Sequence, residues 1–171
     1  MCIRDSIEIE AIGEFGLIDE LTADFVLRND SSIKGVGDDS AVMSSKEGEH
    51  KLMSSDMLVE GVHFNLSYMP LKSLGFKAVS VNVSDIYSMN GMPEQITVSL
   101  GVSSKFPVEA LKELYAGIHA ACEYYAVDLV GGDTTSSYSG LIISISVIGT
   151  VAKNKITYLS LIHISEPTRP Y

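Results

Sequence analysis

The spacing of apolar residues alternates along the chain between helical and strand-like patterns, and each change marks an expected element. Helical spacing appears in residues 18–25, in 71–89 and again after Pro107. Alternating or short apolar runs predict strands at 33–36, 51–55, 59–64, 95–102, 127–130 and 141–151. The predicted order is therefore βββαβαββ after an N-terminal helix.

This mixture of elements indicates a layered α+β (α/β) domain. Its sheet is expected to be mixed, with the helices packed on one face. The first long helix should direct Leu74, Ala78, Val81 and Ile86 toward that sheet. The opposite face of the sheet should be apolar, and an exposed apolar face favours a homodimer formed through the sheet.

Composition narrows the classes of function. Apolar residues make up 46% of 171 residues, which suits one domain with a real core. No run approaches the ~18 apolar residues of a membrane helix, so no membrane partner is expected. The net charge of −10 argues against a nucleic-acid partner, which would need a basic face. The only cysteines are Cys2 and Cys122, too few for a disulfide framework, so a cytoplasmic location is expected.

The two ends of the chain do not look like parts of the fold. The first six residues, MCIRDS, lack the apolar region of a signal peptide. Residues 159–171 follow a strand-like segment at 155–158 and carry Pro167 and Pro170. Both ends resemble translated sequencing-adapter reads. We therefore expect foreign tails at 1–6 and 159–171 and a native domain at 7–158.

Acidic residues recur beside glycine or serine, either after an expected strand or, for Asp85, within an expected helix. These segments are Gly37-Asp38-Asp39, Ser54-Ser55-Asp56, Ser84-Asp85 and Gly131-Gly132-Asp133. Carboxylates gathered in one cleft repel each other unless cations fill it, and their hard oxygens suit Mg²⁺ shared with nucleotide phosphates. Each segment alone is also an ordinary turn dipeptide.

Asp85 is the sharpest of these residues. It follows Val81 by four residues and Ala78 by seven, so helical spacing directs it toward the buried side, where a carboxylate needs a partner such as a metal ion. The phosphate loop GxxxxGK[ST] and the protein-kinase motifs are absent from the sequence. The residues themselves therefore indicate a Mg²⁺–nucleotide site of no specified type.

Five ordered motifs make the interpretation specific. They are GEFGLID at 13–19, VGDDSAV at 36–42, SSDMLVEGVHF at 54–64, KAVSVNVSDIYSMNG at 77–91 and VGGDTT at 130–135. Their order and spacing resemble thiamine-monophosphate kinase, within the superfamily of aminoimidazole ribonucleotide synthetase. The resemblance covers about residues 7–158. It implies a dimeric, ATP-binding N-terminal domain, followed in the family by a C-terminal domain that is absent here.

The resemblance also implies transfer of the γ-phosphate of ATP to thiamine monophosphate, which gives thiamine diphosphate. Residues that match Mg²⁺ ligands of the family are Asp39, Ser54, Ser55, Asp56, Asp85 and Asp133. Tyr115, Gly132 and Asp133 match contacts to ATP, and His63 matches a contact to the substrate. Without the family, His63 would be interpreted as an ordinary strand histidine and Tyr115 as helix packing. No protein nucleophile is implied, because the phosphate of the substrate itself attacks.

Two other hypotheses remain open. An aminoimidazole ribonucleotide synthetase-like enzyme would carry a lysine-bearing DGVGTK-like segment after Asp56, whereas this chain has EGVHF at 60–64. A non-catalytic metal-binding dimerisation module would bind neither nucleotide nor substrate. The family continues past residue 158 with an arginine that contacts ATP, so the chain by itself is expected to be inactive.

Overall fold

The computed structural model describes residues 16, 30–36, 38, 40–103 and 106–158. The expected N-terminal helix at 18–25, both expected tails and Asp39 lie outside this part. The strands are β1 Ser32–Lys34, β2 Ala41–Ser44, β3 Glu49–Val59, β4 Met92–Val102, β5 Asp128–Ser136 and β6 Ile142–Ala152. The helices are α2 Leu71–Ser88 and α3 Val108–Tyr125.

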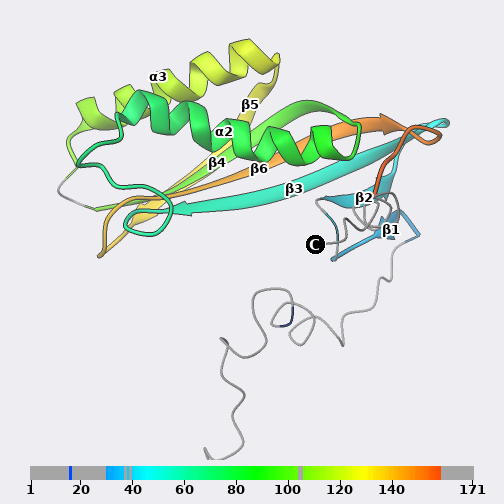
Figure 1. Cartoon of the computed structure of the whole chain (residues 1–171), viewed down its shortest axis with the longest axis horizontal. Coiled ribbons are helices and arrows are strands. Elements are labelled where there is room, and N and C mark those ends of the chain that lie inside the picture. The colour runs from blue at the N-terminus through cyan, green and yellow to red at the C-terminus, as the bar shows by residue number, and fades with distance from the viewer. Residues whose placement is uncertain (1–15, 17–29, 37, 39, 104–105, 159–171) are drawn as a thin grey trace, which may run out of the picture.

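The six strands form one mixed sheet in the order β1-β2-β3-β6-β4-β5. All neighbours are antiparallel except β4 and β5, which are parallel and joined through α3. Both helices lie side by side on one face of the sheet (Figure 1). The predicted α+β class, with helices on one face of a mixed sheet, is confirmed.

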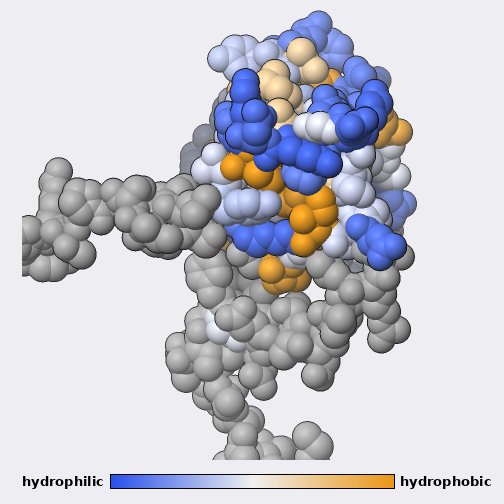
Figure 2. Space-filling model, turned by 90° about the vertical axis from the view of Figure 1, so that its right-hand side faces the viewer, coloured by the Kyte–Doolittle hydropathy of each residue, from blue (hydrophilic) through white to orange (hydrophobic). Residues whose placement is uncertain are grey.

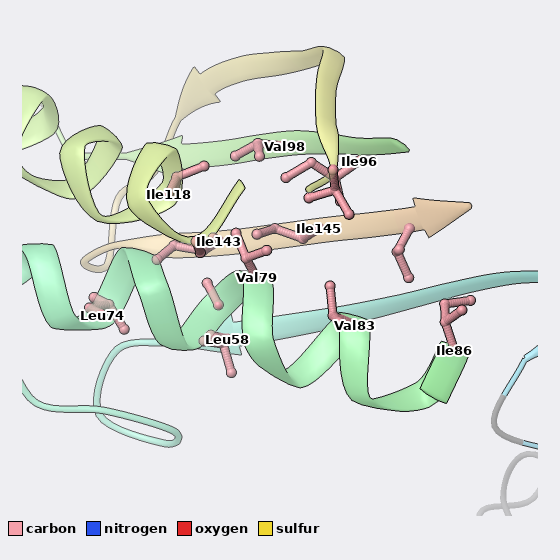
Figure 3. Close-up of a cluster of buried hydrophobic side chains, with 14 of the residues drawn as sticks. Leu58, Leu74, Val79, Val83, Ile86, Ile96, Val98, Ile118, Ile143 and Ile145 are labelled. Atoms are coloured by element: carbon pink, nitrogen blue, oxygen red, sulfur yellow. The ribbon is translucent and has the colours of Figure 1, made fainter. Parts of the chain in front are cut away.

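The core lies between this helical layer and the sheet. Every second residue of β6 is buried, including Ile143, Ile145 and Val147, because alternate strand residues face the helices. Figure 3 shows Ile143 and Ile145 among apolar residues of α2 and α3, such as Val79 and Ile118. Buried α2 residues include Leu74, Ala78, Val79, Val83 and Ile86. The predicted inward face of α2 is confirmed at all positions except Val81, which is half-buried.

The strands before α2 differ from those predicted, although the order βββ is the same. The runs at 51–55 and 59–64 are not two strands: β3 is continuous from Glu49 to Val59, and residues 60–64 form a turn. Strand β2 was not predicted. Residues 155–158, expected to be strand-like, form no strand.

The face of the sheet opposite the helices is more polar than predicted. It carries Thr97, Ser99, Ser144, Ser146 and Thr150 on its central strands. Apolar residues also lie on this face, among them Met53 and Met57 of β3 and Ile142 and Ile148 of β6. The open face is therefore mixed, and the expected apolar face is only partly apolar.

A polar network also crosses the open face. Lys51 Nζ donates to Glu94 Oε2 at 2.6 Å, and Thr150 Oγ1 donates to Glu94 Oε1 at 2.8 Å. The hydrogen bond from Lys51 lowers the pKa of Glu94. On the side of the molecule shown in Figure 2, hydrophobic residues likewise lie in small patches between hydrophilic ones. In the described part of the chain, no helix has both the length and the apolar character to span a membrane.

The two helices approach closely through a pair of glycines. A Cβ on Gly117 of α3 would overlap the carbonyl oxygen of Lys72 on α2, and a Cβ on Gly75 would overlap that of Leu114. The backbones are therefore in direct contact at both points. This contact fixes α3 relative to α2, and α3 contributes Tyr115 to the site described below.

We expect Gly117→Ala to destabilise the domain by about 1–3 kcal/mol, because the added methyl group overpacks this contact. In a helix without this contact, replacing glycine by alanine would stabilise the helix by about 1 kcal/mol. A loss of stability in Gly117→Ala would therefore be due to the close contact. Urea unfolding of the chain measures it, with Glu113→Ala at an exposed position of α3 as a near-neutral control. A stabilised Gly117→Ala variant would contradict the close contact.

Candidate functional site

One polar cluster lies between β3 and α2 and consists of Ser54, Asp56, Asn82 and Asp85. Ser54 and Asp56 alternate with the buried Leu52 and Leu58, so all four strand positions face the helices. Ser54 Oγ donates a hydrogen bond of 2.5 Å to Asp85 Oδ2. The helix thus directs Asp85 toward the sheet, as its spacing predicted.

Asn82 anchors the strand side of this cluster. Its side chain is buried; Nδ2 donates to Ala78 O at 2.9 Å, and Oδ1 accepts from the Asp56 N–H at 2.9 Å. Strand β2 pairs with β3 only as far as Met53, so the amide of Asp56 lies beyond the paired part of that edge. Asn82 satisfies this donor and holds Asp56 against the helix. The sequence interpretation did not single out Asn82, although an amide within an apolar helix face signals such a role.

Ser55 does not belong to this cluster. Its hydroxyl lies on the open face, where it donates to Ile145 O at 3.3 Å and accepts from Ser146 Oγ at 3.0 Å. Neighbouring strand residues point to opposite faces, so the side chains of Ser54 and Ser55 cannot meet at one ion. Only a backbone atom of Ser55 could approach the β3–α2 cluster.

A second site lies between β5 and α3. It is a hollow of about 520 Å³ lined by Val98, Tyr115, Leu129, Gly131, Gly132, Asp133 and Thr134. The structure thus brings together Tyr115, Gly132 and Asp133, the three residues matched to ATP contacts. We call this hollow the β5 pocket. A Cβ on Gly132 would overlap the Val98 carbonyl oxygen, so only glycine lets β5 pair with β4 at this point.

The strand that lines the β5 pocket differs from the prediction. The sequence suggested a short buried strand at 127–130, but β5 runs from Asp128 to Ser136 and is exposed at every position. The apolar character of Leu129 and Val130 was misleading, because they lie 44% and 60% exposed on an edge strand. Asp133 therefore lies inside a strand and not at its end.

A larger, mainly apolar hollow of about 650 Å³ adjoins the β5 pocket. Tyr115 and Leu129 line both hollows, and the new lining residues include Ile118, Cys122 and Val127. Burial, followed by the nearby charge of Asp128, raises the pKa of the Cys122 thiol, so this thiol stays protonated at neutral pH.

The β3–α2 cluster and the β5 pocket are connected by one row across the sheet. Asp56 pairs with Ile145, Ile145 with Val98, and Val98 with Gly132. Three strand spacings separate Asp56 from Gly132, or about 14 Å. Among the described residues, no three His, Cys, Asp or Glu side chains come together as a metal site. Of the expected single carboxylate cleft, the structure shows the pair Asp56 and Asp85, with Asp133 lying across the sheet.

His63 lies in the turn that follows β3 and not on a strand, which corrects the prediction. The Val59 N–H donates to His63 Nδ1 at 3.0 Å, and the His63 N–H donates to Val59 O at 2.9 Å. Lys77 Nζ of α2 donates to the His63 carbonyl oxygen at 3.2 Å. These bonds hold an exposed imidazole at the end of the strand that carries Ser54 and Asp56.

The fold agrees with comparisons to known proteins. Residues 37–151 match the family model of AIR synthase related protein, N-terminal domain, and the chain belongs to this family. Individual relatives point to a narrower group within this family, and they include the thiamine-monophosphate kinases of Bacillus subtilis and Aquifex aeolicus. The first is 37% identical over 148 residues, 86% of this chain and 45% of the relative. The second is 37% identical over 131 residues, 75% of this chain and 40% of the relative.

A solved structure gives the same result. AaThiL complexed with AMPPCP and TMP superposes with a TM-score of 0.77 at 26% identity, covering 97% of this chain and 57% of that chain. The resemblance to thiamine-monophosphate kinase is therefore confirmed. The chain spans less than half the length of these two curated relatives.

Proposed function

We propose that this chain supplies the ATP- and Mg²⁺-binding part of a thiamine-monophosphate kinase. The observation that carries the proposal is the meeting of Tyr115, Gly132 and Asp133 in the β5 pocket, next to a larger apolar hollow. A backbone with glycine at the pocket wall lets phosphates approach closely, and the apolar hollow beside it suits a flat base. The complex of AaThiL with AMPPCP and TMP supports the same ligands.

The β3–α2 cluster fits a hard divalent cation. It offers the carboxylates of Asp56 and Asp85 and the hydroxyl of Ser54, and oxygen is the ligand that Mg²⁺ prefers. Bound there, Mg²⁺ would neutralise the charge that repels an anionic acceptor from an anionic donor. Asp39, Ser55 and Asp133 remain proposed ligands through their match to the family.

The reaction requires no nucleophile from the protein. A phosphate oxygen of thiamine monophosphate attacks the γ-phosphorus of ATP and forms the new P–O bond. The bond from that phosphorus to the β,γ-bridging oxygen breaks, and ADP leaves with the electron pair. The contribution of the protein is positioning and electrostatic stabilisation of this transfer.

We assign His63 to the acceptor. The imidazole lies in the turn just beyond Val59, three residues along β3 from Asp56, or about 10 Å at the usual rise of a strand. An exposed imidazole at that distance from the cluster is suited to contact the organic part of an acceptor whose phosphate lies near the cations.

We also infer a homodimer formed through the open face of the sheet, where Met53 and Met57 are exposed and no helix packs in the described part of the chain. We place the protein in the cytoplasm, where ATP is available.

We expect the 171-residue chain to bind AMPPCP with Mg²⁺ but not to form thiamine diphosphate from ATP. The chain matches only 45% and 40% of the lengths of two such kinases, so residues that position the two phosphates in them have no counterpart here. Misplacement of reacting groups by ~1 Å can already lower the rate of transfer about a hundredfold. Calorimetry with AMPPCP measures binding, and a product assay measures turnover. Failure to bind AMPPCP would contradict the proposed function, and turnover of roughly 1–100 s⁻¹ would show that the chain is complete as a kinase.

A further inference from the structure

The turn Glu60–Phe64 is tied to the segment that leads into β6 through one residue, Glu60. Its backbone N–H donates to Leu141 O at 3.0 Å, and its side-chain Oε2 accepts from the Leu141 N–H at 2.9 Å. Glu60 therefore grips both polar backbone groups of one buried residue. A Cβ on the preceding Gly140, whose φ is +81°, would press against the Glu60 side chain, so glycine makes room for the carboxylate there.

The segment bound by Glu60 follows β5, the strand that lines the β5 pocket. Strand β5 ends at Ser136, and the Ser137 N–H donates to Val102 O at 2.9 Å before the chain reaches Leu141. The Glu60 side chain thus links the turn that contains His63 to the segment that follows β5, the strand that contains Gly132. No role in the proposed reaction has been assigned to this glutamate so far.

The state of His63 depends on the same turn. A backbone N–H can only donate, so the bond from Val59 N–H requires His63 Nδ1 to be an unprotonated acceptor. In a neutral imidazole, the proton must then reside on Nε2, which becomes a hydrogen-bond donor. The Gly61 N–H donates to Phe64 O at 2.8 Å and closes the turn around this arrangement. Opening the turn would release the ring to exchange between both tautomers.

We propose that Glu60 is a positioning residue that holds the turn Glu60–Phe64 closed and thereby fixes His63 as the tautomer protonated on Nε2. The charged and polar groups on this unit are the Glu60 carboxylate, which faces Leu141 N–H, and Lys77 of α2, which faces the His63 carbonyl oxygen. Lys77 holds the turn from the helix side and Glu60 from the sheet side. That Nε2–H donates a hydrogen bond to thiamine monophosphate rests on the proposed function. The tautomer of His63 does not depend on that function.

The experiment is long-range ¹H–¹⁵N spectroscopy of the imidazoles in the 171-residue chain, without ligand, well above the ordinary histidine pKa of ~6.5. The signal of His63 is assigned from its loss in His63→Gln. In the unsubstituted chain, Nδ1 should show the shift of an unprotonated nitrogen and Nε2 that of a protonated one. Glu60→Ala should move both toward averaged values and speed hydrogen exchange at the Val59 amide by about tenfold, the effect of losing one net hydrogen bond.

Two further variants separate positioning from charge and from folding. Glu60→Gln keeps an oxygen that accepts from Leu141, so it should restore the single tautomer. Glu60→Asp keeps the charge but is one methylene too short, so it should behave like Glu60→Ala and serves as the second test if the alanine variant folds poorly. Glu109→Ala, at an exposed position of α3, should change nothing.

An unchanged His63 tautomer in both Glu60→Ala and Glu60→Asp, with β6 amides still protected, would overturn the inference. A mixture of tautomers in the unsubstituted chain would also overturn it. Neither result would touch the proposed kinase function, which depends on nucleotide binding in the β5 pocket. Conversely, failure to bind AMPPCP would remove that function and leave the tautomer result standing.

Discussion

Gly132→Ala should abolish AMPPCP binding to this chain, with a loss of affinity of about a hundredfold or more. The added Cβ would overlap the carbonyl oxygen of Val98, which belongs to the β4 backbone and cannot rotate away. Strand β5 must therefore shift from β4, and each backbone hydrogen bond lost to a charged phosphate costs about 1.5–3 kcal/mol, so one or two such losses lower the affinity about a hundredfold. The shift also moves Asp133, the next residue on β5, relative to Tyr115.

Gly131→Ala is the matched control, because a Cβ on Gly131 would meet nothing within 4 Å. The control adds the same methyl group to the neighbouring residue of the same exposed strand, so it should keep most of the affinity. Calorimetric titration of both variants with AMPPCP and Mg²⁺ gives the comparison. Thermal unfolding should show a loss of about 1–3 kcal/mol for Gly132→Ala, the usual cost of overpacking. Equal affinities for the two variants would remove Gly132 from the nucleotide site.

The sequence predicted the elements whose pattern is set by burial. Strand β6 alternates buried and half-buried residues along its whole length, and α2 repeats apolar residues with helical spacing, so both were predicted. Strand β3 was divided in two because Ser54 and Asp56 occupy positions facing the helices, where apolar residues are the usual signal. The proposed metal ligands thus interrupt the alternation that would have identified their strand.

Strands β5 and β2 were the least predictable part of the fold. Strand β5 is exposed at all its positions, so burial imposes no alternation on it, and its two glycines look like a turn. Strand β2 has only four residues and pairs with just one end of β3. Its length and composition do not distinguish it from a loop in the sequence.

The composition of the site was predicted better than its geometry. Six matched residues lie either in the β3–α2 cluster or in the β5 pocket: Ser54, Asp56, Asp85, Tyr115, Gly132 and Asp133. Their separation across the sheet could not be predicted, because it depends on β6 and β4 lying between β3 and β5. Strand order is set by tertiary packing, and no local pattern encodes it.

The β3–α2 cluster makes a second strong prediction, which concerns Asp85→Asn. The Ser54 hydroxyl donates to the Asp85 carboxylate, and Asp56 lies two residues further along β3 on the same, helix-facing side of the strand. The asparagine variant has the shape of the original side chain, and its Oδ1 can still accept from Ser54. What it lacks is one negative charge, so it tests cation binding and not packing.

In metal-free buffer, Asp85→Asn should differ little in stability from the unsubstituted chain, because the asparagine Oδ1 can still accept from Ser54. With Mg²⁺ or Mn²⁺ added, the unsubstituted chain should become clearly the more stable. A cation at a hundred times its Kd stabilises the native state by about 2.7 kcal/mol, and a tenfold weaker site gives only about 1.4 kcal/mol. Thermal unfolding across a cation titration measures both terms.

Ser55→Ala is the control, because the Ser55 hydroxyl lies on the opposite face of the sheet and its loss should leave the cation effect unchanged. If Asp85→Asn and the unsubstituted chain gain the same stability from the cation, Asp85 is not a ligand, and the Mg²⁺ site of the proposed kinase must be sought away from the β3–α2 cluster.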